Sequence, residues 1–324
     1  MTVTQMQAGD TPPPRPASPR TDVTGSSRQG RLGAWKGVDA TVGLFAVPGV
    51  ALYVTFFLAP IGLGLMDAFT NADGVSASKW VGLQNFTELL HDAAFRAALL
   101  HTAVFAAVIT IGQNVAGLGL ALLLNRSRRL TALLRGAFFV PALLSSAVVA
   151  LVWGFVFSPL TGVVTHVLGW VGVRWSQGAD LLGTPTSAMF SISAVVIWQF
   201  AGYLMVIYLA GLKNIPEEVY EAVRLDGASV VQTFWHVTLP LLRPATSVAL
   251  TIAIVGNIRL FDPVWLLTGG GPGTATETAS TLIYRTAFQN GRFGYAAAQS
   301  IIVVVLIVVV VTAQRLAMGR DPKA

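Results

Sequence analysis

The amino-acid sequence predicts an all-α membrane protein with six transmembrane helices and with both termini in the cytoplasm. Hydrophobic residues make up 54% of the 324 residues and charged residues only 11%, and the mean hydropathy is +0.66. An ordinary soluble domain has about 25% charged residues. Six segments are apolar over about 20 residues, which is the length that a helix needs to cross the hydrocarbon core. Their continuous apolar character favours helices over barrel strands, which alternate over about 10 residues.

The expected spans are residues 41–66, 99–124, 136–157, 187–212, 245–268 and 295–313. The second span carries Gly112 and Gly117, and small residues allow the backbones of two helices to approach closely. Gln113 and Asn114, near its middle, are expected to face other helices or a cavity, and hydrogen bonding between helices is the favoured role. The third span contains Pro141, which a membrane helix tolerates only where neighbouring groups bond the freed carbonyl.

The positions of the basic residues predict the topology. The N-terminal tail, the connections at 125–135 and 213–244 and the C-terminal tail hold most of the Lys and Arg. The other connections hold only Lys79, Arg96, Arg174, Arg285 and Arg292. Cytoplasmic loops are enriched in Lys and Arg, so both termini are expected in the cytoplasm. The net charge of +6 therefore follows the topology and does not indicate nucleic-acid binding. The sequence contains no cysteine, which excludes disulfides.

Two domains are expected. Residues 1–36 are rich in Pro, Ser, Arg and Gly, cannot bury a core, and are predicted to be a disordered cytoplasmic tail. Residues 37–320 form the six-helix domain. The first span is too long and begins too late for a secretory signal, so we expect it to remain uncleaved.

The connection between the fourth and fifth spans, "EEVYEAVRLDGASVVQTFWHVTLPLLRP" (217–244), is unusually charged for this chain. Pro216 suits the first position of a helix, and Glu217 and Glu218 lie where the helix dipole favours negative charge. One face of this helix is apolar and the other is charged; the apolar face carries Val219, Ala222 and Val223, and the charged face carries Glu217, Glu221 and Arg224.

This connection is expected to bend at Asp226–Gly227, because glycine adopts backbone angles that other residues avoid. Ser229 and Gln232 have the spacing of a capping box at the start of a second helix. That helix is expected to stop at Leu239–Pro240. The pattern predicts two short cytoplasmic helices joined by a glycine bend. An interfacial hairpin without a partner is the alternative to a protein-binding surface.

A solute pathway should show polar groups near the middle of the membrane, because such groups are costly there without a use or a partner. Trp198, Gln199 and Tyr203 in the fourth span meet this description, as does Asn257 in the fifth. Arg259 and Asp262 follow towards the outside. An aromatic ring beside amide groups suits a sugar. Packing between helices is the alternative role for Gln199, Tyr203 and Asn257. An ion pair on one helix face is the alternative for Arg259 and Asp262.

Catalytic and cofactor-binding motifs are not evident. The sequence has no G-x-x-x-x-G-K-[ST] motif, so this chain is not expected to bind ATP phosphates itself. The glycine cluster at 269–273 lacks the following lysine and is interpreted as an exposed turn after the fifth span. The four histidines have no metal-binding spacing, and no set of nucleophile, base and acid stands out. The chain is therefore not expected to be an enzyme or to hold a cofactor or metal.

The segment "EAVRLDGASVVQTFWHVTLP" resembles the EAA signature of the membrane subunits of binding-protein-dependent ABC importers. The residues that match are Glu221, Ala222, Gly227, Leu239 and Pro240. Val223 and Val237 replace the third alanine and an isoleucine of the signature. The stretches "VGLQNF", "PALLSSAVVALVWGFVF" and "FDPVWLLTGGGPGTATETASTLIYRTAFQNGRFGYAAAQS" look like the carbohydrate branch, similar to the maltose and glycerol-3-phosphate permeases, and "TGGGP" is the most specific of these signals.

This resemblance implies the fold of a type I importer permease in a bacterial inner membrane. It implies that the EAA loop, residues 213–244, contains a coupling helix that docks on an ATPase. The residues assigned to coupling are Glu217, Glu218, Glu221, Ala222, Arg224, Asp226, Gly227, Leu239 and Pro240. The implied partners are a second permease, two ATPase subunits that hold ATP and Mg, an extracytoplasmic solute-binding protein, membrane lipid and a sugar-like substrate.

The resemblance also bears on the substrate. Tyr203 and Asn257 fall where the maltose permease has a tyrosine and an asparagine that contact sugar. Other contact positions differ and carry Val196, Phe200, Ala253 and Leu260, which argues against maltose itself. A non-sugar solute such as glycerol phosphate, phosphate, an amino acid or a peptide is the closest alternative. A secondary transporter or channel is a further alternative, although inverted repeats are not evident. A membrane enzyme is the least favoured.

Overall fold

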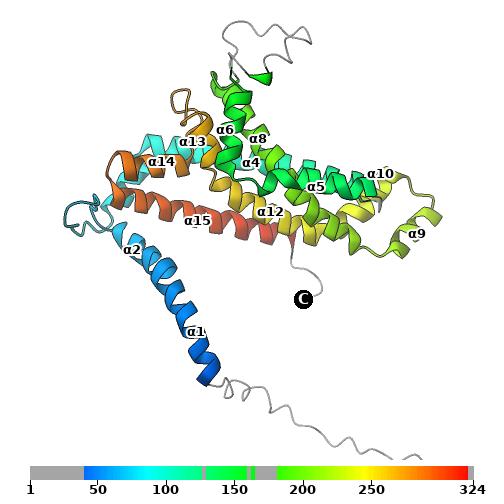
Figure 1. Cartoon of the computed structure of the whole chain (residues 1–324), viewed down its shortest axis with the longest axis horizontal. Helices are drawn as coiled ribbons and strands as arrows, with labels where there is room; N and C mark the ends of the chain where they lie inside the picture. Colours follow the sequence, from blue (N-terminus) through cyan, green and yellow to red (C-terminus); the bar gives the residue numbers. More distant parts are fainter. Residues whose placement is uncertain (1–39, 126–128, 159–161, 165–180, 320–324) are drawn as a thin grey trace, which may run out of the picture. The chain divides into compact units, whose positions relative to one another are not determined.

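The computed structural model describes residues 40–125, 129–158, 162–164 and 181–319 (Figure 1). Within these ranges the secondary structure is helical apart from turns and one isolated bridge between Thr70 and Trp80. The tail at 1–36, which the sequence predicts to be disordered, lies outside the described residues. The chain divides into two compact units, residues 1–58 and 59–324.

The first unit contains α1 (Ala40–Tyr53), with Pro48 inside it, and a π-helical turn (Val54–Leu58). All side chains described here, from Ala46 to Leu58, are exposed. The stretch Ala46–Asp67 is long and apolar enough to cross a membrane. An exposed apolar helix of this length suits contact with lipid.

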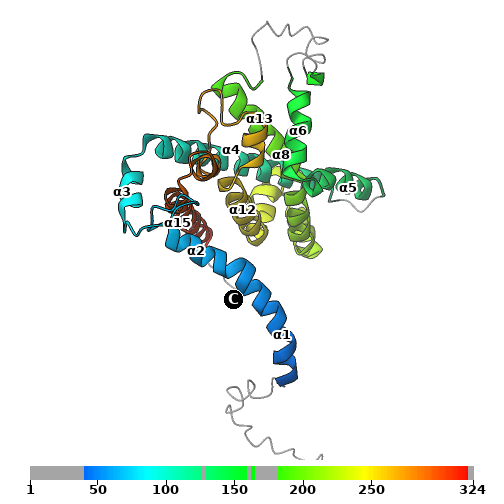
Figure 2. The ribbon, with the colours of Figure 1, turned by 60° about the vertical axis from the view of Figure 1, so that its left-hand side comes forward.

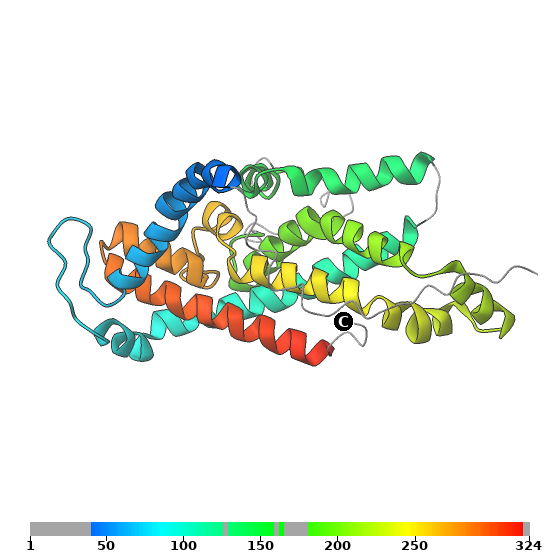
Figure 3. The ribbon, with the colours of Figure 1, turned by 90° about the horizontal axis from the view of Figure 1, so that it is seen from below.

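The second unit holds the remaining helices, which form a bundle. In chain order they are α2 (Ala59–Asp67), α3 (Gln84–His91), α4 (Ala93–Leu123), α5 (Arg129–Leu143), α6 (Ser146–Val156), α8 (Pro185–Lys213), α9 (Glu217–Leu225), α10 (Val230–Thr233), α11 (Leu239–Leu241), α12 (Arg243–Ile258), α13 (Asp262–Leu267), α14 (Ala279–Tyr284) and α15 (Phe293–Met318). The helices α4, α8, α12 and α15 run side by side (Figure 3).

Four helical stretches in the described residues are continuous candidates for membrane spans: Ala46–Asp67, Ala93–Leu123, Pro185–Lys213 and Phe293–Met318. Two more candidates are bent pairs. Arg129–Leu143 meets Ser146–Val156 at 98°, and Val230–Leu241 meets Arg243–Ile258 at 69°. The span count is therefore four, or up to six if each bent pair crosses the membrane once.

The predicted third span, 136–157, is wrong as one continuous helix. It breaks at Leu144 and Ser145, and α6 leaves α5 at a steep angle (Figure 2). Pro141 lies in the last turn of α5, where its missing N–H removes one helical hydrogen bond. Ser145, with φ −59° and ψ 132°, is the non-helical residue immediately before α6.

The predicted fifth span, 245–268, is also interrupted. The helix α12 ends at Ile258, and α13 begins at Asp262 after a short break. Pro263 lies in the first turn of α13, where a proline costs no hydrogen bond, whereas inside a continuous helix it would remove one. The proline therefore favours two helices over one.

Glycines bring the central helices close together. A Cβ atom on Gly202 of α8 would overlap the carbonyl oxygen of Phe138 in α5, and one on Gly117 of α4 would lie 2.8 Å from the Cβ of Leu204. Such contacts leave no room for a side chain. Gly117 thus bears out the prediction that small residues of the second span allow close approach.

Buried amides join α4 to the helices around it. The Nδ2 of Asn257 in α12 donates to the Oε1 of Gln113 at 3.1 Å and to the Oγ1 of Thr110 at 3.0 Å. The hydroxyl of Tyr208 in α8 donates to the Oδ1 of Asn114 at 2.8 Å. The prediction that Gln113 and Asn114 bond to other helices is confirmed.

We expect Gly202→Ala to destabilise the protein, because the added methyl forces α5 away from α8 at a cost of about 1–3 kcal/mol. Gly119→Ala in α4 is the matched control, since no atom lies within 4 Å of a Cβ there. Thermal unfolding of the purified chain in detergent measures both. A melting temperature for Gly202→Ala equal to that of Gly119→Ala would contradict the close contact.

Candidate functional site

A cavity of about 360 Å³ opens between α8 and the break that separates α12 from α13. Aromatic walls come from Phe200, Tyr203 and Phe261, and Ser146 contributes a hydroxyl. This volume is within the range of small-molecule sites, which are mostly apolar with a few polar groups that orient the ligand. The cavity can therefore accommodate a small solute with polar and apolar surfaces.

Two charged residues border this cavity, Arg259 and Asp262. Arg259 follows the last residue of α12 and is exposed, whereas Asp262 is the first residue of α13 and is half-buried. They are therefore not on one helix face, which was the basis of the alternative in which they form an ion pair. Among the described residues, ion pairs join Glu277 to Arg285 and Glu88 to Arg292, and neither includes Arg259 or Asp262.

The structure brings together four of the six residues predicted for the pathway. Tyr203, Asn257, Arg259 and Asp262 line the cavity. Asn257 is buried, and its amide nitrogen is already bonded within the protein, so it also has the packing role that was its alternative.

Gln199 and Trp198 are not among the residues that line the cavity. Gln199 is fully buried and donates to the carbonyl oxygen of Leu144 at 3.1 Å, at the break between α5 and α6. Trp198 meets Trp153 edge to face, with ring centroids 5.5 Å apart, and borders a separate apolar groove. In these contacts both side chains have packing roles.

Sequence reasoning missed Ser146, Gly256 and Phe261 as lining residues. Each lies at or near a helix break that the hydropathy pattern does not reveal. Pro263 was the available signal, since a proline two residues after Phe261 indicates a helix start. Among the described residues, no group of three His, Cys, Asp or Glu side chains could hold a metal ion.

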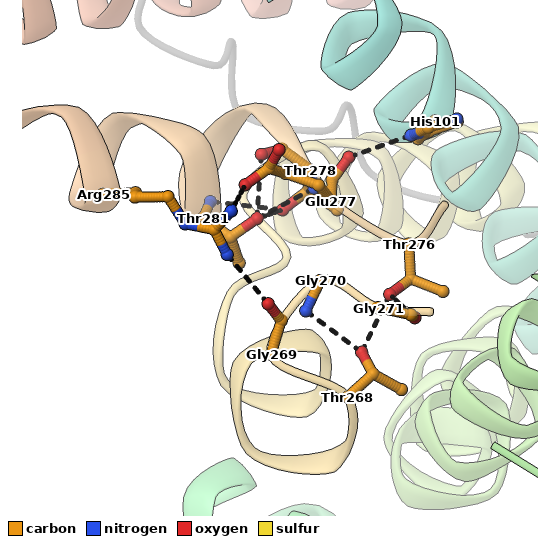
Figure 4. Close-up of polar contacts among 10 residues, drawn as sticks. All are labelled: His101, Thr268, Gly269, Gly270, Gly271, Thr276, Glu277, Thr278, Thr281 and Arg285. Atoms are coloured by element: carbon orange, nitrogen blue, oxygen red, sulfur yellow. Dashed lines mark hydrogen bonds and ion pairs between the residues drawn. The ribbon is translucent and has the colours of Figure 1, made fainter. Parts of the chain in front are cut away.

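The segment after α13 is tied into the bundle by side chains (Figure 4). Gly269, Gly270 and Gly273 have positive φ angles, and Thr276 donates to the carbonyl of Gly271 at 2.7 Å. The prediction of an exposed turn at 269–273 holds only in part, because Gly269 and Gly273 are exposed whereas Gly270 is buried.

Arg285 links both ends of this segment. Its Nη2 donates to the carbonyl of Gly269 at 2.9 Å, and its Nη1 lies 3.0 Å from the Oε1 of Glu277. Burial raises the pKa of Glu277 above its ordinary value, and the nearby charge of Arg285 opposes that shift. The carbonyl of Glu277 also lies 3.2 Å from the Nδ1 of His101 in α4. The segment thereby fixes α13, and with it Asp262, against the bundle.

The elbow, residues 217–242, lies at the opposite end of the bundle from α14 (Figure 1). Its first helix begins at Glu217, so Pro216 is the residue before the helix and not its first position. Gly227 has φ +75°, as the predicted bend requires. The capping box is confirmed, because Ser229 and Gln232 each bond the backbone N–H of the other.

The second helix ends at Leu241, one residue after the predicted stop at Leu239–Pro240. The helix continues through Pro240 to Leu241, after a π-helical turn over Phe234–Thr238. The N–H of Leu239 bonds to the carbonyl of Phe234, five residues back. This wider turn changes the bonding pattern immediately before the proline, which lacks an N–H.

Apolar side chains on the elbow are exposed: Leu225 by 89%, Val230 by 86%, Val231 by 66% and Trp235 by 59%. Five charged side chains of the elbow are also exposed: Glu217, Glu218, Glu221, Arg224 and Asp226. None of the five forms an ion pair with another described residue. Ala222 and Pro240 are exposed and Leu239 is half-buried. Sequence reasoning missed Leu225, Val231 and Trp235, because these apolar residues do not lie on the apolar face that the helical spacing predicts.

Comparisons with known proteins identify the family to which this chain is similar. Residues 113–319 match the family described as binding-protein-dependent transport system inner membrane component. The chain is 35% identical over 258 residues to the probable ABC transporter permease protein YurN of Bacillus subtilis, covering 79% of this chain and 88% of that protein. It is 34% identical over 255 residues to the multiple sugar-binding transport system permease protein MsmF of Streptococcus mutans, covering 78% and 87%.

A solved structure of similar fold is a bacterial alginate ABC transporter in complex with an alginate pentasaccharide-bound periplasmic protein. The match has a TM-score of 0.76 and 25% identity, and covers 91% of this chain and 99% of that chain. The family match spans most of the second unit, including the elbow and the cavity residues. The chain therefore belongs to the binding-protein-dependent transport system inner membrane components, the multi-pass permease subunits of ABC transporters.

Proposed function

We propose that this chain is one transmembrane subunit of an ATP-driven importer that moves a sugar or sugar-like solute into a bacterial cell. Relatives named for sugar transport support the solute class. The cavity supports it independently, because aromatic walls beside hydroxyl and amide groups suit the two kinds of surface that a sugar presents. Tyr203, Asn257, Arg259 and Asp262 are the proposed solute contacts.

The proposed topology has six spans and cytoplasmic termini, with each bent helix pair crossing once. The basic residues around 125–135 and 213–244 support this orientation. The elbow then lies in the cytoplasm, and the segment at 268–278 lies outside. In this topology the end of α12 that borders the cavity is the end away from the cytoplasmic elbow.

The observation that carries the proposed coupling role is the surface of the elbow. Exposed apolar side chains such as Leu225 and Val230 stand among charges without ion-pair partners. Exposed apolar groups rimmed by polar ones mark protein interfaces. We assign this interface to an ATPase subunit, which would hold ATP and Mg. A second permease would complete the pathway.

The elbow connects to the cavity through one helix. Buried Leu242 marks the 69° bend between α11 and α12, and the far end of α12 carries Asn257 and Arg259. Movement of the elbow on ATP binding would reorient α12 and so change access to the cavity. Such coupling requires the two states to bind the ATPase differently.

The alternatives differ in their energy source or solute. A secondary transporter would take up solute in vesicles without any ATPase. An importer of glycerol phosphate, phosphate or an amino acid would keep the coupling elbow and differ at the cavity. Identification of the ligand of the solute-binding protein that serves this permease separates these solutes.

Glu221→Lys and Gly227→Asp are each expected to abolish ATP-dependent uptake and to leave the amount of protein in the membrane unchanged. The first reverses an exposed charge of the interface, and the second places a side chain at φ +75°. Uptake into proteoliposomes and retention of the ATPase on affinity purification measure the effect. Arg96→Glu, a charge reversal on the exposed start of α4, is the control. Full uptake by both elbow variants would refute the docking role.

Tyr203→Ala is expected to raise the KM of uptake about tenfold, which corresponds to about 1.4 kcal/mol. The ring is part of the cavity wall, so its loss removes contact with the solute. Trp198→Ala, on the same helix but outside the cavity, should leave KM within about twofold of the native value. The measurement uses the labelled ligand of the solute-binding protein. The reverse order of the two KM values would show that solute follows another route.

A further inference from the structure

The cavity is balanced in charge. Of the described residues that line it, Arg259 carries the positive charge and Asp262 the negative charge, and the others are uncharged at neutral pH. Neither side chain has an ion-pair partner or a hydrogen bond among the described residues. Charged groups at the edge of a membrane bundle are costly unless they have a partner or a use.

The helix break explains why two opposite charges three residues apart do not neutralise each other. In one continuous helix, residues at this spacing would lie on the same face. Here α12 ends at Ile258 and α13 begins at Asp262, so the chain direction changes between the two side chains. Both therefore border the same cavity and remain available to a third group.

The two groups have complementary hydrogen-bonding capacity. A guanidinium only donates, and a carboxylate only accepts. A hydroxyl does both, so a polyhydroxy solute can satisfy both side chains without bringing any charge. A carboxylated or phosphorylated solute would pair with Arg259 but would leave Asp262 facing a like charge, so it satisfies only one of the two side chains. The apolar walls increase this repulsion because they lower the local dielectric.

We propose that Arg259 and Asp262 form a charge filter that makes this cavity select uncharged polyhydroxy solutes over acidic or phosphorylated ones. The proposal rests on the proposed function and names the substrate class of the same cavity. Rejection of an anion by a like charge is the repulsive element that specificity requires in addition to favourable contacts.

The test uses the natural absence of cysteine, which removes background labelling. Gly256→Cys places a thiol in the cavity, where an added Cβ meets no atom within 4 Å. In native membranes the full-length variant is treated with methanethiosulfonate reagents that are anionic (sulfonatoethyl), cationic (trimethylammonioethyl) or uncharged (hydroxyethyl). Rates are divided by those of 2-mercaptoethanol in solution, an uncharged thiol, to remove the intrinsic reactivity of each reagent.

With both charges present, the hydroxyethyl reagent should have the highest normalised rate. Adding Asp262→Asn should raise the anionic rate relative to the uncharged rate about fivefold, the effect of one unit charge at about 4 Å in water. Adding Arg259→Gln should raise the cationic rate in the same way. Asp262→Glu keeps the charge and should preserve the original order, which a merely steric effect of the substitution would not.

The proposal is overturned if the anionic reagent is already preferred over the uncharged one, or if Asp262→Asn leaves the ratio unchanged. Ser146→Cys provides a second thiol in the same cavity. Failure of all three reagents at both positions would show a cavity closed to solutes and would also overturn it. Labelling needs no ATPase, so it tests the charge selectivity of the cavity separately from transport. The uptake assays test the proposed importer function.

Discussion

Every interruption of a membrane helix frees backbone carbonyls that lipid cannot bond, and this constraint organises the second unit. At the break after α5, Gln199 donates to the carbonyl of Leu144. At the break after α12, Thr278 donates to the carbonyl of Leu260 at 2.9 Å. At the end of α4, Arg135 donates to the carbonyl of Leu124 at 3.0 Å. The cavity exists because two helices are broken, and side chains distant in sequence make those breaks tolerable.

The same constraint explains where sequence reasoning succeeded and where it failed. Buried amides in a span are correctly identified as costly groups that need a partner, but the sequence does not distinguish a solute from a carbonyl at a helix break. Of the predicted pathway residues, Asn257 and Tyr203 line the cavity, whereas Gln199 does not. The partner of Gln199, Leu144, is 55 residues away, and its carbonyl is available only because of a helix break that the hydropathy pattern does not reveal. A hydrogen bond between residues so far apart in the chain leaves no periodic pattern in the sequence.

Local chemistry was predictable at the elbow. The bend at Gly227 and the capping box of Ser229 and Gln232 depend on residues within a few positions of one another, so sequence spacing was sufficient. The continuation through Pro240 was not predictable from the proline alone. A π-helical turn alters the preceding hydrogen bonds, and its formation depends on how the whole segment packs. Thr238, within that turn, is buried and lies 3.4 Å from the hydroxyl of Tyr220 in α9.

This contact bears on how force could pass through the chain. The two arms of the elbow contact each other, because α9 touches the turn that leads into α11, and buried Leu242 joins α11 to α12. Gly211 of α8 permits close approach there, since a Cβ would lie 2.9 Å from the side chain of Leu242. If the elbow docks on an ATPase as proposed, a push on it would either separate α8 from the bend or move α12 as a rigid body. Tight packing resists gradual deformation, so displacement favours a discrete change in α12, whose far end borders the cavity.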